Sequence, residues 1–287
     1  MVQLPPRPRH LPIAPEAGPA HRHLPLAGPS RPIDQRWQPV YAVWEITLRC
    51  DLSCRHCGSR AGRARPDELT TAECLDMVTQ MADLGVKEVT LIGGEAYLRD
   101  DWAEIASAVR SHGMACGITT GGRGFTPERA RMAKDAGVQS VSVSVDGLRD
   151  VHDRLRGAQG SYDAALASLD NLHAVGMPVS ANTQFCRYNI HEMPELLEQL
   201  IVHHIHSWQI QLTVAMGRAA DEPDMLLQPW QMLEVMPGFS EEDLNPGVAW
   251  LYCILFFPLP AACLFRYGQC DDGWTRESPS MLCFALF

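Results

Sequence analysis

Positive charge is scarce in this sequence of 287 residues. Lysine and arginine together number 24, against 34 aspartate and glutamate residues, and the formal net charge is −10. A chain with this balance has no general electrostatic attraction to nucleic-acid phosphates or to anionic lipid headgroups. The composition therefore excludes a non-specific binder of nucleic acid or of membrane surfaces.

A secretory signal is also missing, because the first residues contain no apolar run between their prolines. Ten cysteines in a chain of this length are too sparse for a small fold held together by disulfides. These two absences predict a cytoplasmic protein with free thiols. The hydrophobic fraction of 46% is sufficient for a buried core.

The two ends of the chain differ from its middle. Residues 1–38 contain nine prolines and no periodic apolar pattern, so we expect a disordered arm. Residues 221–287 are expected to form an irregular C-terminal extension. Within it, residues 248–265 are uncharged but contain Pro258 and Pro260, which favours a packed segment or a poorly folding tail over a membrane-spanning helix. This abrupt change in composition is what a truncated or frame-shifted end would give.

Residues 39–220 alternate between short β-branched segments and longer amphipathic ones. We expect strands at residues 42–48, 88–92, 115–120, 140–145, 179–185 and 208–214, and helices at residues 71–84, 101–111, 127–135, 161–174 and 193–203. Such alternation requires parallel strands joined by right-handed crossovers. Six units are too few for a closed eight-stranded barrel. The pattern therefore predicts an α/β fold, either a partial (β/α)6 TIM-like barrel or a doubly wound sheet.

Three of the ten cysteines are clustered. Cys50, Cys54 and Cys57 follow the first predicted strand with the spacing CxxxCxxC. Three thiolates on one short loop can bind three irons of a [4Fe–4S] cluster and leave the fourth iron without a protein ligand. A structural zinc ion needs four ligands, and the adjacent His56 would reach the same ion only with strain. The spacing alone leaves a zinc-stabilised binding module and a chance group of buried thiols as alternatives.

The CDLSCRHC loop resembles the signature of radical S-adenosylmethionine (SAM) enzymes. It is similar in particular to the SPASM-type branch that modifies peptides and proteins, which includes anaerobic sulfatase maturases and ribosomal-peptide maturases. The resemblance extends over residues 41–219 and implies a radical SAM core at residues 39–220. It implies Cys50, Cys54 and Cys57 as ligands of a [4Fe–4S] cluster and SAM as the second cofactor. The open (β/α)6 barrel that is usual in the family agrees with the six predicted units.

Further motifs follow the other predicted strands. Gly93, Gly94 and Glu95 resemble the GGEP motif of the family, with Ala96 in place of proline. Glycines allow the backbone to approach a ligand closely, and a carboxylate or carbonyl beside them can accept a hydrogen bond from the SAM ammonium group. The TTGG segment at residues 119–122 resembles the TNG motif, with glycine where asparagine is usual.

Four more residues are candidates for binding SAM. Ser144 and Arg156 are similar to a serine and an arginine that bind SAM in related maturases, and a hydroxyl and a guanidinium suit its ribose and carboxylate. Arg218 lies in a segment that resembles the family's GRA element, and Asn182 lies in the fifth predicted strand. An ion pair at a helix start would explain Arg156 without a ligand. Asn182 could instead form hydrogen bonds with backbone groups at the end of its strand. The cysteine loop and the GGE, TTGG, SVDG (residues 144–147) and GRA motifs all fall at the ends of predicted strands, and ligands of parallel α/β folds bind at that edge of the sheet.

The resemblance implies reductive cleavage of SAM to a 5′-deoxyadenosyl radical that abstracts hydrogen from a substrate, expected to be a peptide or protein side chain. It also implies a low-potential electron donor such as flavodoxin or ferredoxin. A radical SAM enzyme for a small metabolite and a degenerate cluster-binding protein without turnover are the alternatives, and no catalytic residue is assigned.

The C-terminal cysteines are too widely spaced for the auxiliary clusters of this branch, so none is predicted. Cysteines in predicted core positions are interpreted as small hydrophobic residues: Cys74, Cys116 and Cys186.

Overall fold

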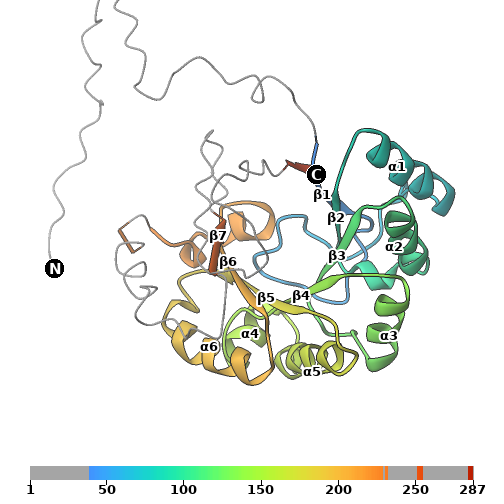
Figure 1. Ribbon diagram of the computed structural model, residues 1–287. Coiled ribbons are helices and arrows are strands. Elements are labelled where there is room, and N and C mark those ends of the chain that lie inside the picture. Colours follow the sequence, from blue (N-terminus) through green and yellow to red (C-terminus); the bar gives the residue numbers. More distant parts are fainter. Residues whose placement is uncertain (1–38, 229, 232–250, 255–283, 287) are drawn as a thin grey trace, which may run out of the picture. The chain divides into compact units, whose positions relative to one another are not determined.

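The computed structural model describes residues 39–228, 230–231, 251–254 and 284–286, so the arm predicted at residues 1–38 and most of the extension predicted at residues 221–287 lie outside the described residues. Within the described residues, one sheet of parallel strands has the order β7-β6-β5-β4-β3-β2-β1-β8 (Figure 1). The strands are β1 (Tyr41–Glu45), β2 (Glu88–Ile92), β3 (Ala115–Thr120), β4 (Ser140–Ser144), β5 (Val179–Phe185), β6 (Ser207–Leu212), β7 (Leu251–Ile254) and β8 (Phe284–Leu286).

Strands β1 to β6 follow one another in chain order and curl into a half-barrel with helices along its outer side (Figure 1). This arrangement confirms the partial (β/α)6 barrel. A doubly wound sheet would reverse its strand order part-way, and this one does not. Strand β7 extends the sheet beyond β6, and β8 pairs with β1 at the opposite edge. The sequence pattern predicted neither of these two strands.

The predicted helices are present, with bounds within one residue of those expected. They are α1 (Thr71–Asp83), α2 (Trp102–Ser111), α3 (Pro127–Asp135), α5 (Ser161–Ala174) and α6 (Met193–Val202). Thr70 and Glu73 form a reciprocal capping box at the start of α1, and Thr126 caps α3. A sixth helix, α4 (Arg149–Arg156), was not predicted from the sequence.

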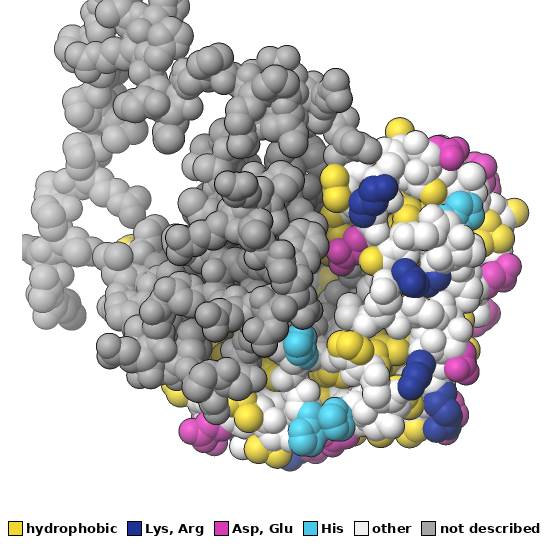
Figure 2. Space-filling model, viewed as in Figure 1, with side chains coloured by type: hydrophobic (Ala, Val, Ile, Leu, Met, Phe, Trp, Pro, Cys, Tyr) yellow, Lys and Arg dark blue, Asp and Glu magenta, His cyan; other side chains and the backbone are white. Residues whose placement is uncertain are grey.

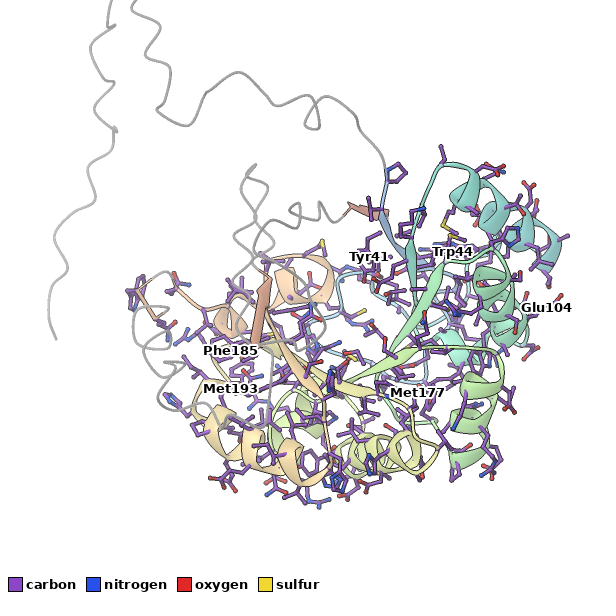
Figure 3. The ribbon with its side chains drawn as sticks, viewed as in Figure 1. Tyr41, Trp44, Glu104, Met177, Phe185 and Met193 are labelled. Atoms are coloured by element: carbon purple, nitrogen blue, oxygen red, sulfur yellow. The ribbon has the colours of Figure 1, made fainter. Side chains whose placement is uncertain are left out.

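The core lies between the sheet and the helices. Alternate strand residues such as Val89, Leu91 and Val143 join helix residues in one buried cluster. Figure 3 shows the side chains of this layer, in which Met177 and Met193 are buried, whereas Glu104 points outward from α2. None of the described helices is long and apolar enough to cross a membrane. On the face drawn in Figure 2, charged side chains of both signs are scattered over the helices.

The inner face of the sheet is polar from β3 to β6. The strand register places hydroxyl-bearing residues side by side in one row: Thr119, Ser142, Ser180 and Ser207. Nearer the C-terminal ends of the strands, further rows consist of Ser144, Asn182 and Gln209, and of Gln184 and Gln211. Hydroxyl and amide groups thus line the side of the sheet that the helices do not cover.

Candidate active site

The loop with the three cysteines leaves β1 and is fixed by hydrogen bonds to its own return segment. The backbone N–H of Cys50 donates to the carbonyl oxygen of Gly62 at 3.0 Å, and the N–H of Gly62 donates to Leu48 at 2.8 Å. Inside the loop, the N–H groups of Leu52 and Ala61 lie 3.4 Å from the sulfurs of Cys50 and Cys57. N–H groups directed at cysteine sulfurs stabilise them as thiolates.

Two distant segments hold the rest of the loop. At the end of α4, the carbonyl oxygens of Leu155 and Arg156 accept hydrogen bonds from Arg55 and Ser53, at 2.8 and 3.2 Å. Beyond β6, Arg218 donates its backbone N–H to Cys57 at 2.9 Å. Its guanidinium donates to the carbonyl oxygens of Cys54 at 2.6 Å and Ala61 at 3.1 Å. All described contacts of Arg218 with the loop are therefore to its backbone, and a contact with SAM stays a prediction.

The two glycines after β2 lie directly against the start of the loop. Gly94 donates its N–H to Thr47 and Glu95 donates to Arg49, both at 2.8 Å. A Cβ atom on Gly94 would overlap the carbonyl oxygen of Arg49 and lie 2.7 Å from Cys50 Cβ, and one on Gly93 would overlap the carbonyl oxygen of Thr47. The close approach predicted for these glycines therefore occurs, and its partner in the structure is the cysteine loop.

Glu95 joins the ends of β2 and β3. Its buried carboxylate accepts hydrogen bonds from Thr120 Oγ1 at 2.6 Å and from the N–H of Gly121 at 2.5 Å. Burial raises the pKa of Glu95 to about 7, although these hydrogen bonds oppose the shift. A side chain at Gly121 would collide with Glu95 and Leu52, which explains glycine at this position. Each carboxylate oxygen has a second lone pair with which it can accept from an ammonium group.

Arg156 lies between the loop and a buried carboxylate. Its Nε atom is 2.7 Å from Asp146 Oδ2, and its Nη1 atom is 3.7 Å from the sulfur of Cys54. The Nε2 atom of His56 is 3.1 Å from the same carboxylate oxygen. Arg156 is the last residue of α4 and not at a helix start, but it does form a buried ion pair, as the alternative without a ligand expected, and its contact with SAM stays a prediction.

Asp146 and His56 are the site residues that sequence reasoning missed. Burial alone would raise the pKa of Asp146, but Arg156 and His56 beside it hold that pKa well below its usual range. The buried imidazole of His152 accepts the backbone N–H of Asp146 at 3.0 Å, and burial lowers its pKa to about 4, so it is neutral. A carboxylate two residues after Ser144, at the end of a strand, was the signal that could have identified Asp146.

Ser144 and Asn182 are neighbours across β4 and β5. Both are largely buried on the inner face, with exposed fractions of 6% and 7%. Neither side chain forms a hydrogen bond within the described part of the chain, which leaves both available to a ligand. The structure thus brings the cysteines, the two glycines, Glu95, Arg156 and Arg218 around one loop, with Ser144 and Asn182 on the strands beside Asp146.

The donor set fits a cluster better than a single ion. Among the described residues, no three or more His, Cys, Asp or Glu side chains are grouped to bind one metal ion. The three thiols of the loop are one ligand short of a structural zinc site and match three corners of a cube, so the chemistry of the donor set favours a cluster. Burial raises the pKa of Cys50 to about 12, and iron must displace the proton of this thiol when it binds. The cysteines Cys74, Cys116 and Cys186, which are interpreted as small hydrophobic residues, are free thiols and buried.

A family model described as the radical SAM superfamily matches residues 44–200. This chain belongs to the radical SAM superfamily. Its members are enzymes that use a [4Fe–4S] cluster and SAM, and these are the cofactors that the site fits.

Curated relatives of the chain include proteins with different substrates. It is 32% identical to an AdoMet-dependent heme synthase of Methanosarcina barkeri over 216 residues, which are 75% of this chain and 58% of that protein. It is 33% identical to a mycofactocin maturase of Mycobacterium tuberculosis over 159 residues, which are 55% of this chain and 40% of that protein. The chain spans about half the length of the curated relatives it matches.

Solved structures share the fold. SuiB of Streptococcus suis bound to S-adenosylmethionine matches 76% of this chain and 50% of its own, with a TM-score of 0.62 and 16% identity. The structure titled anSMEcpe with bound AdoMet and Kp18Cys peptide matches 75% of this chain and 64% of its own, with a TM-score of 0.62 and 12% identity. At these identities the likeness establishes the fold alone.

We expect that Gly94→Ala prevents the loop from holding iron. The added methyl group would collide with Arg49 and Cys50, and displacing groups that support metal ligands typically lowers metal affinity about 10–100-fold. Iron and sulfide content after anaerobic reconstitution measures the effect. Gly62→Ala is the matched control, because a Cβ atom there meets nothing within 4 Å. Equal iron content in both variants, with far-UV circular dichroism unchanged, would contradict the role assigned to Gly94.

Proposed function

We propose that this chain is a radical SAM enzyme that generates a 5′-deoxyadenosyl radical and abstracts hydrogen from a peptide or protein side chain. The observation that carries the proposal is the triple attachment of the cysteine loop, to the GGE segment, to α4 and to Arg218. When bound, the [4Fe–4S] cluster supplies one electron that breaks a carbon–sulfur bond of SAM, giving methionine and the radical.

In this proposal each residue has a distinct task. Cys50, Cys54 and Cys57 bind three irons, and the fourth iron is left for SAM. The Gly93–Glu95 segment fixes the loop and offers a carboxylate to the SAM ammonium group. Ser144 offers a hydroxyl and Asn182 an amide to the rest of SAM. Neither group is hydrogen-bonded within the described part of the chain. The buried surroundings exclude water from the reacting groups.

Anaerobic reconstitution with iron and sulfide, followed by dithionite and SAM, tests the proposal without knowledge of the substrate. We expect about four irons per chain and formation of 5′-deoxyadenosine. Cys54→Ala should abolish both, because one corner of the cluster loses its ligand. Cys74→Ala is the matched control and should change neither, since Cys74 is a buried core residue of α1.

Two outcomes would contradict the proposal. An intact cluster that yields no 5′-deoxyadenosine would identify a cluster-binding protein without turnover. Equal loss of iron in Cys54→Ala and Cys74→Ala would show that the ligand set is wrong.

The inner face of the sheet favours a peptide over a porphyrin as substrate. Relatives include both heme synthases and mycofactocin maturases. A porphyrin with several carboxylates needs cationic partners, but the rows across β4, β5 and β6 consist of serine, asparagine and glutamine. Amides such as the hydrogen-bonded pair Gln184 and Gln211 both donate and accept, as a peptide backbone does. A porphyrin is therefore the second candidate.

Deuterium transfer distinguishes the two substrate classes. Synthetic uncharged peptides with deuterated side chains should transfer deuterium to 5′-deoxyadenosine, and deuterated coproporphyrin should not. Replacing Gln184 and Gln211 by leucine should lower the transfer about tenfold, because two hydrogen bonds of about 0.5–1.5 kcal/mol each are lost. The exposed Gln80→Leu is the control. Transfer from the porphyrin alone, measured by mass spectrometry, would reverse the assignment.

We also propose that an acidic flavodoxin or ferredoxin delivers the electron at the basic segment around the cysteine loop. Residues 49–65 contain five arginines and one acidic residue, Asp51, in a chain with a net charge of −10. Ion pairs with carboxylates outside the segment engage three of them, Arg55, Arg60 and Arg65. The exposed Arg63 has no hydrogen-bond or ion-pair partner among the described residues, so its charge is available to a partner. Complementary charge raises the rate of association between proteins.

For this interface, Arg63→Glu should slow flavodoxin-supported SAM cleavage severalfold at low ionic strength, and added salt should reduce the difference. Cleavage supported by dithionite should be unchanged, because a small reductant needs no docking surface. Arg131→Glu on α3, also exposed, is the control. An equal effect on both reductants would place Arg63 in the SAM site instead, and no effect on either would place the donor elsewhere.

A further inference from the structure

One buried carboxylate connects the cysteine loop to two other parts of the fold, α4 and β5. Asp146 follows β4 and is fully buried. Its Oδ2 atom contacts Arg156 of α4 and His56 of the loop, at 2.7 and 3.1 Å. Its Oδ1 atom accepts the backbone N–H of Gln184 in β5 at 2.8 Å. The side chain thus contacts loop, helix and strand through three partner atoms, two on Oδ2 and one on Oδ1.

The backbone of the same residue is also fixed. The N–H of Asp146 donates to His152 Nδ1 at 3.0 Å, and its carbonyl oxygen accepts from Asn189 Nδ2 at 2.7 Å. The carboxylate therefore has a single position, and a group that contacts it is held there too. Arg156 is such a group, and its second nitrogen reaches the sulfur of Cys54.

This ion pair requires an explanation beyond stability. Burying two charges has a desolvation cost that can exceed their attraction, so a buried ion pair is weak evidence of a stabilising role. Its location is specific, because one partner contacts a proposed cluster ligand. Near a cluster, the charge of the surroundings affects how readily an electron is accepted. Alone, Arg156 would place a full positive charge beside the sulfur of Cys54, and Asp146 compensates that charge.

We propose that Asp146 is a positioning residue of the cluster site, which holds Arg156 beside Cys54, fixes His56 within the cysteine loop and compensates the positive charge beside Cys54. The inference rests on the proposed function, since it concerns the cluster that the three cysteines would bind. It assigns Asp146 no contact with SAM or substrate.

A cycle of charge-removing variants tests this role. Asp146→Asn leaves Arg156 uncompensated and should shift the midpoint potential of the cluster in the positive direction. Arg156→Gln leaves Asp146 uncompensated and should shift it in the negative direction. The double variant removes both charges and should return the potential close to that of the wild type. Redox titration followed by electron paramagnetic resonance, without SAM, measures all four proteins, so the readout does not depend on turnover.

Glu128→Gln is the matched control, because it removes one carboxylate from an exposed ion pair with Arg131 and should leave the potential unchanged. Shifts of the same sign in the two single variants, or a double variant that fails to return towards wild type, would overturn the role. If a single variant binds no iron, recovery of iron in the double variant supports the proposal, and its absence there contradicts it. If the wild type itself binds no cluster, the proposed function fails first, and the inference fails with it.

Discussion

The geometry of this site depends on fixing a loop that has no regular secondary structure. Three cysteines on such a loop can bind one cluster only if the backbone between them keeps a single conformation, which costs conformational entropy. The compensating hydrogen bonds join the loop to other segments. The glycine segment donates to the carbonyl oxygens of Thr47 and Arg49, the loop donates to carbonyl oxygens at the end of α4, and Arg218 donates to the loop. These groups belong to the first, second, fourth and sixth strand–helix units. The loop is therefore positioned only when the half-barrel is complete.

Two buried carboxylates beside this loop differ in charge because their partners differ. Glu95 receives hydrogen bonds only from uncharged donors, and its pKa is raised to about 7. Asp146 contacts Arg156 and His56, and its pKa stays low despite complete burial. Asp146 is consequently ionised at neutral pH, whereas Glu95 can gain a proton near neutrality. A cation such as the ammonium group of SAM would keep Glu95 ionised.

Periodicity and spacing were sufficient for the elements but not for the contacts between them. The core strands and most helices carry clear apolar periods, and the sequence predicted them. Helix α4 has eight residues with only Val151 and Leu155 apolar, too few for a period to be recognised. The cysteine loop was located because its residues are close in sequence. The contact of His56 with Asp146 joins residues far apart in the chain and depends on how the barrel curls, which no local pattern encodes.

The two faces of the sheet have different roles: the outer face packs against the helices and stabilises the fold, and the inner face is the proposed substrate face. Val141 and Val143 of β4 pack into the core beneath the helices, and substitutions there would cost stability. Ser142 and Ser144 alternate with them on the inner face, where side chains can change without disturbing that core. Relatives with heme and with mycofactocin activities can thus share one framework for SAM chemistry. Gln184 connects the proposed cluster site with the proposed substrate face. Its backbone N–H donates to Asp146, and its side chain donates to Gln211. The proposed substrate face is thereby held at a fixed position relative to the proposed cluster.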